Sequence, residues 1–268
     1  MNKNSFLYNF LHGVNLIRLK IYHKFSEKKL QDWYLRTDYS EKLRKFKGIH
    51  SGERCFVIGN GPSLKPEDLD LITDEYSFSC NKIYKILDKT KWRPYYYVVD
   101  DYGFVSTDYN NIINTVKAQA KFIGIEFEKK LAVPFEGTDV ILMKERTILH
   151  GNRPEWNLDI DQYICAGHTV TFPMIQLAIY MGFKEIYLLG NDCSYLATFE
   201  NGVKGKNHFY ESEDDKTSQQ DAANLFFAFE SIKECAREND VRIYNATRGG
   251  ALETFERVNL ESVVGLDP

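Results

Sequence analysis

Short apolar runs alternate with helical stretches over most of the chain, beginning at Cys55. Seven runs have the length and the β-branched and aromatic content of buried strands: residues 55–58, 76–80, 95–100, 120–125, 139–143, 185–190 and 241–244. Helices are predicted from Pro66, over residues 169–181 before Gly182, and over residues 218–237. This alternation predicts an α/β fold, a Rossmann-like and mostly parallel sheet with helices on both faces.

The first segment has a different pattern, because its apolar residues recur at helical spacing from Phe6 to Phe25. Lysines and arginines fill much of the rest of this segment. A basic amphipathic helix can lie on an anionic membrane surface, or pack on the main domain or on a second subunit. We expect a basic amphipathic helical extension over residues 1–50, followed by a single Rossmann-like α/β domain over residues 51–268.

Composition narrows the class of protein. The chain has 268 residues, of which 43% are hydrophobic and 27% are charged, and this excludes intrinsic disorder and collagen-like repetition. The five cysteines never occur at CxxC spacing, so we expect reduced thiols of a cytoplasmic protein and no zinc site. No apolar run is long enough for a membrane-spanning helix.

The net charge of −4 is the sum of a basic segment and an acidic segment. Residues 1–50 carry eleven Lys and Arg against four Asp and Glu, whereas the remainder is acidic. An acidic main body argues against nucleic acid as a partner, because nucleic-acid binders present a basic face. The basic end is consistent with contact at the inner face of the cell membrane.

Polar residues follow several of the predicted strands, at the edge where open parallel sheets bind ligands. The first strand ends in Gly59-Asn60-Gly61-Pro62-Ser63, a turn whose amides and hydroxyl could approach a phosphate or a ribose. Leu64 replaces the third glycine of a dinucleotide fingerprint and no Walker lysine follows, so a purely structural turn is an equal alternative. Three further strand ends carry Asn81, Asp100-Asp101 and Asn191-Asp192. Together they predict a nucleotide-sized site, and Asp100-Asp101 could hold Mg²⁺.

Candidates for acid–base and phosphate chemistry lie in later loops. His208, in the polar loop at residues 206–211, is a natural general base, against the alternative of a solvated surface residue. His168 precedes a predicted helix, where it could cap the helix or meet a phosphate. Arg248 precedes two glycines after the last strand and could clamp a phosphate, or simply mark a turn.

The order of these motifs resembles a known group of proteins. VIGNGPSL at residues 57–64, AGHTVTFPMIQLAIYMGFKEIYLLGND at 166–192 and the later NHFY resemble bacterial sialyltransferases of glycosyltransferase family 42. They equally resemble domain of unknown function 115, which includes 6-hydroxymethylpterin diphosphokinase-like proteins. The resemblance covers residues 52–258 and implies a GT-A-like variant of the Rossmann-like fold.

The resemblance implies roles for individual residues. Donor-binding positions of family 42 correspond to Gly59, Asn60, Gly61, Ser63, Asn81, Asp100, Ala166, Gly167 and Asp192. Asp100 stands where the family has asparagine and Ala166 where it has serine, and the second change weakens the case for cytidine. The tyrosine that steadies the departing phosphate falls beside Tyr195, with Tyr210 and Arg248 as further donors. The catalytic histidine aligns nearer Glu211, so His208 or Glu211 would be the base, and we favour His208.

The implied activity is that of an inverting glycosyltransferase of bacterial surface-polysaccharide biosynthesis (O-antigen, capsule or lipooligosaccharide). It would move a sugar, such as a nonulosonate from a CMP-linked nucleotide sugar, to a glycan acceptor that could be lipid-linked, without a required cofactor. The alternative is an ATP-dependent diphosphokinase acting on a small hydroxymethyl compound such as a pterin, with Mg²⁺ on Asp100 and Asp101. A binding module that has lost its base is a third alternative. We also expect a homo-oligomer.

Overall fold

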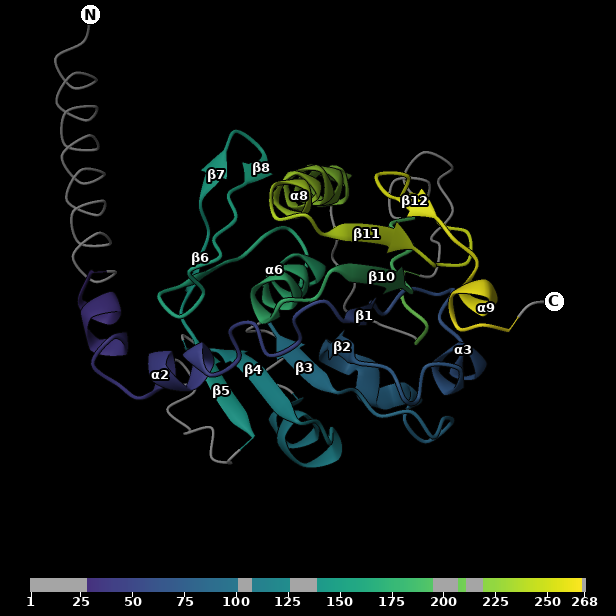
Figure 1. Cartoon of the computed structure of the whole chain (residues 1–268), viewed down its shortest axis with the longest axis horizontal. Coiled ribbons are helices and arrows are strands. Elements are labelled where there is room, and N and C mark those ends of the chain that lie inside the picture. The colour runs from purple at the N-terminus through teal and green to yellow at the C-terminus, as the bar shows by residue number, and fades with distance from the viewer. Residues whose placement is uncertain (1–27, 101–107, 126–138, 195–206, 211–218, 267–268) are drawn as a thin grey trace, which may run out of the picture.

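An eight-stranded parallel sheet forms the centre of the computed structural model (Figure 1). The structure describes residues 28–100, 108–125, 139–194, 207–210 and 219–266. The strand order is β12-β11-β10-β1-β2-β3-β4-β5. The strands are β1 (Arg54–Ile58), β2 (Ser77–Cys80), β3 (Tyr96–Val99), β4 (Ala120–Gly124), β5 (Val140–Met143), β10 (Glu185–Leu189), β11 (Arg242–Asn245) and β12 (Glu256–Arg257). The α/β class and the parallel sheet predicted from the pattern are confirmed.

The order of the strands reverses beside β1, and this fixes where a site can form. From β1 the chain adds β2, β3, β4 and β5 in one direction, and then returns to place β10, β11 and β12 on the other side. β1 and β10 are paired in register from Arg54 with Glu185 to Ile58 with Leu189. In open α/β sheets, ligands bind beyond the carboxyl ends of the strands at such a switch point. The loops after β1 and β10 therefore frame the candidate site.

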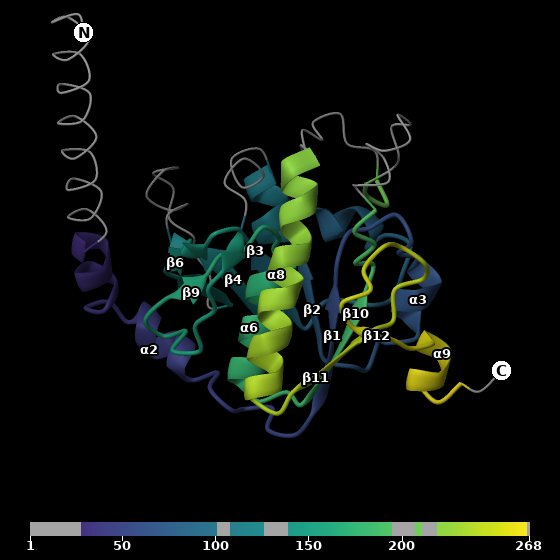
Figure 2. The same ribbon diagram turned by 90° about the horizontal axis from the view of Figure 1, so that it is seen from above.

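Helices cover both faces of the sheet, and side chains alternate between the two layers. Cys55 and Val57 of β1 belong to one buried cluster, with α6 (Thr171–Met181) and α8 (Gln219–Glu238) above it. Phe56 and Ile58 belong to a second cluster on the other face. Figure 2 shows α6 and α8 side by side across the sheet. The second face is covered by α3 (Pro66–Asp70), η1 (Asn81–Ile86), the π-helical turn η2 (Asn111–Thr115) and α9 (Leu260–Val263).

The region between β5 and α6 contains short strands. It forms β6 (Glu145–Arg146) and β9 (Ile164–Cys165), which pair with each other, and the hairpin of β7 (Leu149–His150) and β8 (Arg153–Pro154). Most of the segment over residues 193–217 lies outside the described residues. Among the helices of the described ranges, none combines the length and the apolarity that crossing a bilayer requires.

The described part of the predicted extension packs onto the sheet. Tyr34 is fully buried and donates its hydroxyl to the carbonyl of Leu142, and Leu43 of α2 (Tyr39–Arg44) is buried in the core above β5. Residues 48–52 then bind the open end of α6, because the amides of Gly48 and His50 donate to the carbonyls of Tyr180 and Met181. The boundary drawn at residue 50 therefore divides residues that share one core. Residues 1–27 lie outside the described residues.

Candidate functional site

The glycine turn after β1 is held tightly against the end of β10. The amides of Gly59 and Gly61 donate to the carbonyls of Leu189 and Gly190, each at 2.8 Å. A methyl group on Gly59 would lie 2.5 Å from the Gly190 carbonyl oxygen, and one on Gly61 would lie 1.8 Å from Asp192 Oδ2. Glycine is required at both positions because the two strand ends approach more closely than any side chain allows. The structural interpretation of this turn is thus supported by direct contacts.

Asp192 connects three loops of the site by hydrogen bonds. Its carboxylate, which is only 6% exposed, accepts hydrogen bonds from the Ser63 amide at 3.2 Å and the Ser63 hydroxyl at 2.9 Å. Its carbonyl oxygen accepts from the amide of Ala251 at 2.7 Å. Burial raises the pKa of the Asp192 carboxyl, and the two bonds from Ser63 oppose that shift. Asp192 therefore joins the glycine turn to the loop after β11.

These contacts change the expected role of the turn's backbone. The amides of Gly59, Gly61 and Ser63 donate within the protein, and Pro62 has no amide hydrogen. Asn60 is different, because its amide hydrogen has no hydrogen-bond partner among the described residues. Its carboxamide oxygen is also buried and accepts no hydrogen bond within the described ranges, while its Nδ2 donates to the Cys80 carbonyl at 3.2 Å. Asn60 is thus the residue of the turn best able to contact a ligand.

Asn81 presents a second such group at the end of β2. Its backbone is left-handed, with φ of 46°, a conformation that asparagine tolerates better than most residues. Its carbonyl oxygen accepts from the buried hydroxyl of Tyr97 at 2.6 Å, which fixes the backbone. The Asn81 Oδ1 atom is buried and accepts nothing from the part of the chain that the structure describes. Two neighbouring strand ends thus carry carboxamide oxygens that a ligand hydroxyl or amino group could satisfy.

Asp100 lies directly beyond β3 and is half-buried. Burial, and after it the charge of Asp100, raises the pKa of the Cys80 thiol to about 12. The carbonyl oxygen of Cys80 is also the acceptor of the Asn60 carboxamide. Asp101, its predicted partner in a metal site, lies outside the described residues. Within the described ranges, no three His, Cys, Asp or Glu side chains converge as a metal site would require.

The loop that carries His208 reaches the glycine turn. The amide of Phe209 donates to the Asn60 carbonyl at 3.0 Å, which joins residues that are distant in sequence. The imidazole of His208 stacks on the ring of Tyr210, with centroids 4.9 Å apart and planes inclined by 6°. The backbone next to His208 therefore lies against the glycine turn, and a shared catalytic site of His208 and Asn60 stays a prediction. Tyr195 and Glu211 lie outside the described residues, and their roles stay predictions.

Ala166 and Gly167 lie between β9 and α6, in the segment that precedes the helix. A methyl group on Gly167 would meet Phe172 at 2.6 Å, so glycine is needed there for packing. At the start of α6 the Thr171 hydroxyl donates to Asn191 Oδ1 at 2.8 Å, which ties this helix terminus to the end of β10. His168 bonds to the Asn152 carbonyl oxygen at 3.0 Å, a contact that holds the preceding loop.

Arg248 forms ion pairs with two carboxylates. Its guanidinium donates to Asp68 Oδ1 and Oδ2 at distances between 2.8 and 3.2 Å, and it also binds Glu261. It therefore ties α3 to α9, and these bonds raise its pKa further. Asp70, two residues after Asp68 in α3, accepts from the hydroxyl of Thr90 and the amide of Lys91. Both of these α3 acids thus have structural partners, and a phosphate contact by Arg248 stays a prediction.

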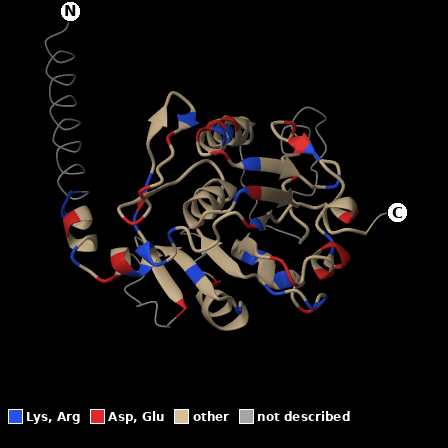
Figure 3. Ribbon diagram, viewed as in Figure 1, with Lys and Arg blue, Asp and Glu red and all other residues tan. Residues whose placement is uncertain are grey.

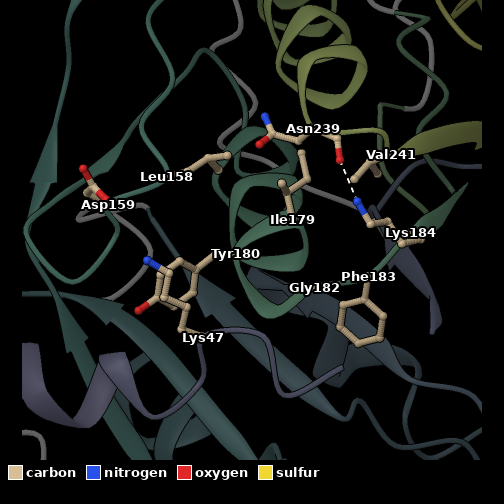
Figure 4. A pocket seen from close by; sticks show the side chains of 10 residues that line it. All are labelled: Lys47, Leu158, Asp159, Ile179, Tyr180, Gly182, Phe183, Lys184, Asn239 and Val241. Atoms are coloured by element: carbon tan, nitrogen blue, oxygen red, sulfur yellow. Dashed lines mark hydrogen bonds between the residues drawn. The ribbon is translucent and has the colours of Figure 1, made fainter. Parts of the chain in front are cut away.

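A separate hollow lies at the opposite edge of the sheet (Figure 4). Its volume is about 280 Å³, and it opens between the ends of α6 and α8, where Lys184 donates to the Asn239 carbonyl at 2.7 Å. Tyr180 and Lys47 lie on one side, with the ammonium 5.8 Å from the centre of the ring. Because Lys184 and Val241 precede β10 and β11, this hollow is remote from the strand-end loops.

Sequence reasoning missed two features of the site. The Ser63–Asp192 pair joins residues 129 positions apart, and nothing in either local pattern indicates the pairing. Lys85 of η1 lies with its ammonium 4.9 Å from the centre of the Tyr210 ring. Its one sequence signal is its place four residues after Asn81, in the segment that follows β2.

A family model described as 6-hydroxymethylpterin diphosphokinase MptE-like matches residues 27–198. A search of curated proteins finds no match. The sialyltransferase CstII from Campylobacter jejuni, in complex with cytidine-5'-monophosphate, is similar with a TM-score of 0.48, at 17% identity over 78% of this chain and 85% of that one. Its complex with CMP-3FNeuAc gives 0.46 at 17% identity, covering 77% and 85% of the two chains. An α-2,3-sialyltransferase from the same organism gives 0.39 at 17% identity, covering 72% and 75%.

Proposed function

The chain belongs to the 6-hydroxymethylpterin diphosphokinase MptE-like family, and on that premise we propose that it is a transferase acting on a nucleotide-activated donor. Its reaction is the transfer of a sugar from a CMP-linked donor to a glycan acceptor, with inversion. The hydrogen bond from the Phe209 amide to the Asn60 carbonyl carries this proposal, because it sets a histidine beside the loop where the donor phosphate would lie. A base next to the leaving group is what such a transfer needs.

On the donor side, the proposal rests on the groups that the fold leaves available. The buried carboxamide oxygens of Asn60 and Asn81 accept ribose hydroxyls or a base amino group. The Asn60 amide donates to the phosphate, where Gly59, Gly61 and Ser63 cannot, since their amides are occupied. Tyr195 supplies a further hydroxyl to the phosphate.

In the proposed transfer, His208 accepts the proton of the acceptor hydroxyl. The acceptor oxygen forms its bond to the anomeric carbon while the bond from that carbon to the phosphate oxygen breaks. The nucleotide leaves with the electron pair, and attack from the opposite face inverts the anomeric centre. Glu211 is the alternative base.

Nucleotide binding and turnover together test the proposal. We expect CMP and CDP to raise the melting temperature, and the wild-type protein to release CMP from CMP-N-acetylneuraminate. His208→Ala should lower turnover by about 10²- to 10⁴-fold, the usual contribution of a general base. Glu211→Gln should have a smaller effect. Unchanged turnover in both variants would show that neither side chain is the base.

The family description favours a second candidate, an ATP-dependent diphosphokinase acting on a hydroxymethylpterin or a similar compound. In that reaction Asp100 and Asp101 would hold Mg²⁺, which neutralises charge on the transferred diphosphate. The residue beyond β3 is thus an acid in a suitable position, at the same edge as the glycine turn. Stabilisation by ATP with Mg²⁺, and none by CMP or CDP, would select this candidate.

The setting of the reaction is part of the proposal. We place the protein in bacterial surface-polysaccharide biosynthesis, with contact at the inner membrane face through residues 1–27. Trp33 and Leu35, which are 39% and 47% exposed, could extend that contact. Figure 3 shows basic and acidic residues interspersed over the described elements. A chain starting at residue 28 should fail to bind anionic phosphatidylserine vesicles that the full chain binds; equal binding would contradict the membrane role.

A further inference from the structure

Three side chains form a column beside the glycine turn. The Lys85 ammonium lies 4.9 Å from the centre of the Tyr210 ring, and that ring lies nearly parallel to the imidazole of His208 at 4.9 Å. Phe209 meets the Tyr210 ring edge-on, at 5.0 Å and 86°. A cation over an aromatic face and an offset ring stack are both attractive arrangements. The imidazole of His208 therefore lies nearly parallel to the Tyr210 ring and in contact with it.

Both ends of the column are anchored to the candidate site. Lys85 belongs to η1, which begins at Asn81 and is fixed to the core by the buried side chains of Ile83 and Ile86. At the other end, Phe209 packs against the core of the same face and its amide bonds to Asn60. The column thus connects the two strand ends that carry the available carboxamide oxygens.

We propose that Tyr210 and Lys85 are positioning residues for His208, holding its imidazole in the orientation in which it accepts the acceptor proton. This inference rests on the proposed function. A reaction is faster when its base is already held in the reactive orientation, because the side chain then loses little rotational freedom on reaching the transition state. The Tyr210 ring is the flat surface on which the imidazole stacks, and the ammonium of Lys85, a residue of η1, holds that ring by a cation–π contact.

The exposure of these residues separates this role from a structural one. Lys85 is exposed and the rings of His208 and Tyr210 are half-buried, so the column adds little to the core. Exposed cation–π contacts contribute modestly to stability. We therefore expect substitutions in the column to leave the melting temperature close to that of the wild type while they lower turnover.

Kinetics of CMP release from CMP-N-acetylneuraminate form the first test. Tyr210→Leu and Lys85→Met should each lower kcat and leave the KM for the donor unchanged. For Tyr210→Leu we expect a loss of about tenfold in kcat, which is smaller than the loss caused by removing the base itself. Tyr210→Phe, which keeps the ring but loses the hydroxyl considered as a phosphate donor, should retain most of kcat if the ring is the active part. Lys85→Arg should also retain most of it. Lys89→Met, which removes another exposed lysine nearby, is the matched control and should behave as wild type.

A double-mutant cycle makes the dependence on His208 explicit. In a His208→Ala background, Tyr210→Leu should cause no further loss of kcat, since there is no imidazole left to position. A full additional loss would overturn the proposal. So would a fall in kcat for Tyr210→Phe as large as that for Tyr210→Leu, because the hydroxyl and not the ring would then be the active part.

A spectroscopic test keeps the inference separate from the identity of the donor. With isotope-labelled histidine, the His208 ring protons, identified by their absence in His208→Gln, should show an upfield ring-current shift. That shift should be lost in Tyr210→Leu and retained in Tyr210→Phe. Its absence in the wild type overturns the column whether or not any donor is turned over. Failure of CMP-N-acetylneuraminate to react, with the shift present, would count against the proposed donor alone.

Discussion

At the scale of single residues, the candidate site depends on side chains whose conformations serve two purposes. Asn81 adopts a left-handed backbone and presents a buried carboxamide oxygen, and Asp192 is buried while it accepts two bonds from Ser63. Each therefore influences both stability and ligand contact. Matched substitutions can separate the two contributions.

Asn81→Gly and Asn81→Ala form such a pair. Both variants lose the carboxamide oxygen, so both should bind the nucleotide about tenfold more weakly, the value of one hydrogen bond. Of the two variants, only Asn81→Ala has a Cβ at a positive φ, so it should be less stable than Asn81→Gly by about 1 kcal/mol of unfolding free energy. Calorimetric titration and urea unfolding measure the two effects. Nucleotide affinity equal to wild type in both variants would remove Asn81 from the donor site.

Asp192→Asn tests the buried carboxyl. Since burial raises the pKa of Asp192, the folded protein holds this proton more tightly than the unfolded chain does. The resulting stability is present below the unfolded-state pKa and is lost as the pH rises through the folded-state pKa. Asparagine can still accept from the Ser63 amide and donate to its hydroxyl.

The stability of Asp192→Asn relative to wild type should therefore improve between about pH 4 and about pH 7, as the wild-type carboxyl ionises. Urea unfolding at the two pH values measures the difference. A constant difference would indicate that the Asp192 carboxyl titrates at its ordinary pKa in the folded protein.

At the scale of elements, the segment before β1 completes the fold. Residues 48–52 bind the last carbonyls of α6, a helix whose every residue is buried, and Gly182 closes it with a φ of 98°. Unpaired carbonyls at the end of a buried helix would be costly. Tyr34 and Leu43 add fully buried side chains from the same segment.

Two truncations distinguish this segment from the residues before it. A chain starting at residue 28 should melt within a few degrees of the full chain. A chain starting at residue 51 loses Tyr34, Leu43 and the cap of α6, and should lose about 5 kcal/mol or more, enough to unfold a domain of ordinary stability. Circular dichroism melting measures both. Equal melting temperatures for the two chains would contradict the role assigned to residues 34–52.

At the scale of the whole molecule, the central sheet could be predicted from the sequence because its strands are buried on both faces. Residues 55–58 and 186–189 are continuous apolar runs, as parallel strands with two covered faces require. The two-residue strands β6 to β9 and β12 have no such pattern, since they form only where distant segments meet. The segment from Phe6 to Phe25, which lies outside the described residues, was ambiguous because an apolar helical face looks the same whether protein or lipid covers it.

The site was predictable in part, for a similar reason. Gly59, Asn60, Asn81 and Asp192 follow strands, and topology alone brings the ends of parallel strands to one edge. Which atoms stay available could not be predicted, because it depends on pairs such as Ser63 with Asp192 and Arg248 with Asp68. Those pairs occupy the amides and the guanidinium that the sequence suggested for a phosphate.

The most direct test of the account is a crystal structure of the protein with CMP. We expect the phosphate within hydrogen-bonding distance of the Asn60 amide, and the nucleoside against the carboxamide of Asn81, with His208 facing the open side of the phosphate. Asn60→Asp, which sets a negative charge beside the phosphate, should abolish that binding. A nucleotide bound elsewhere, as in the hollow beside Tyr180, or bound only as ATP with Mg²⁺, would contradict the proposed glycosyl transfer.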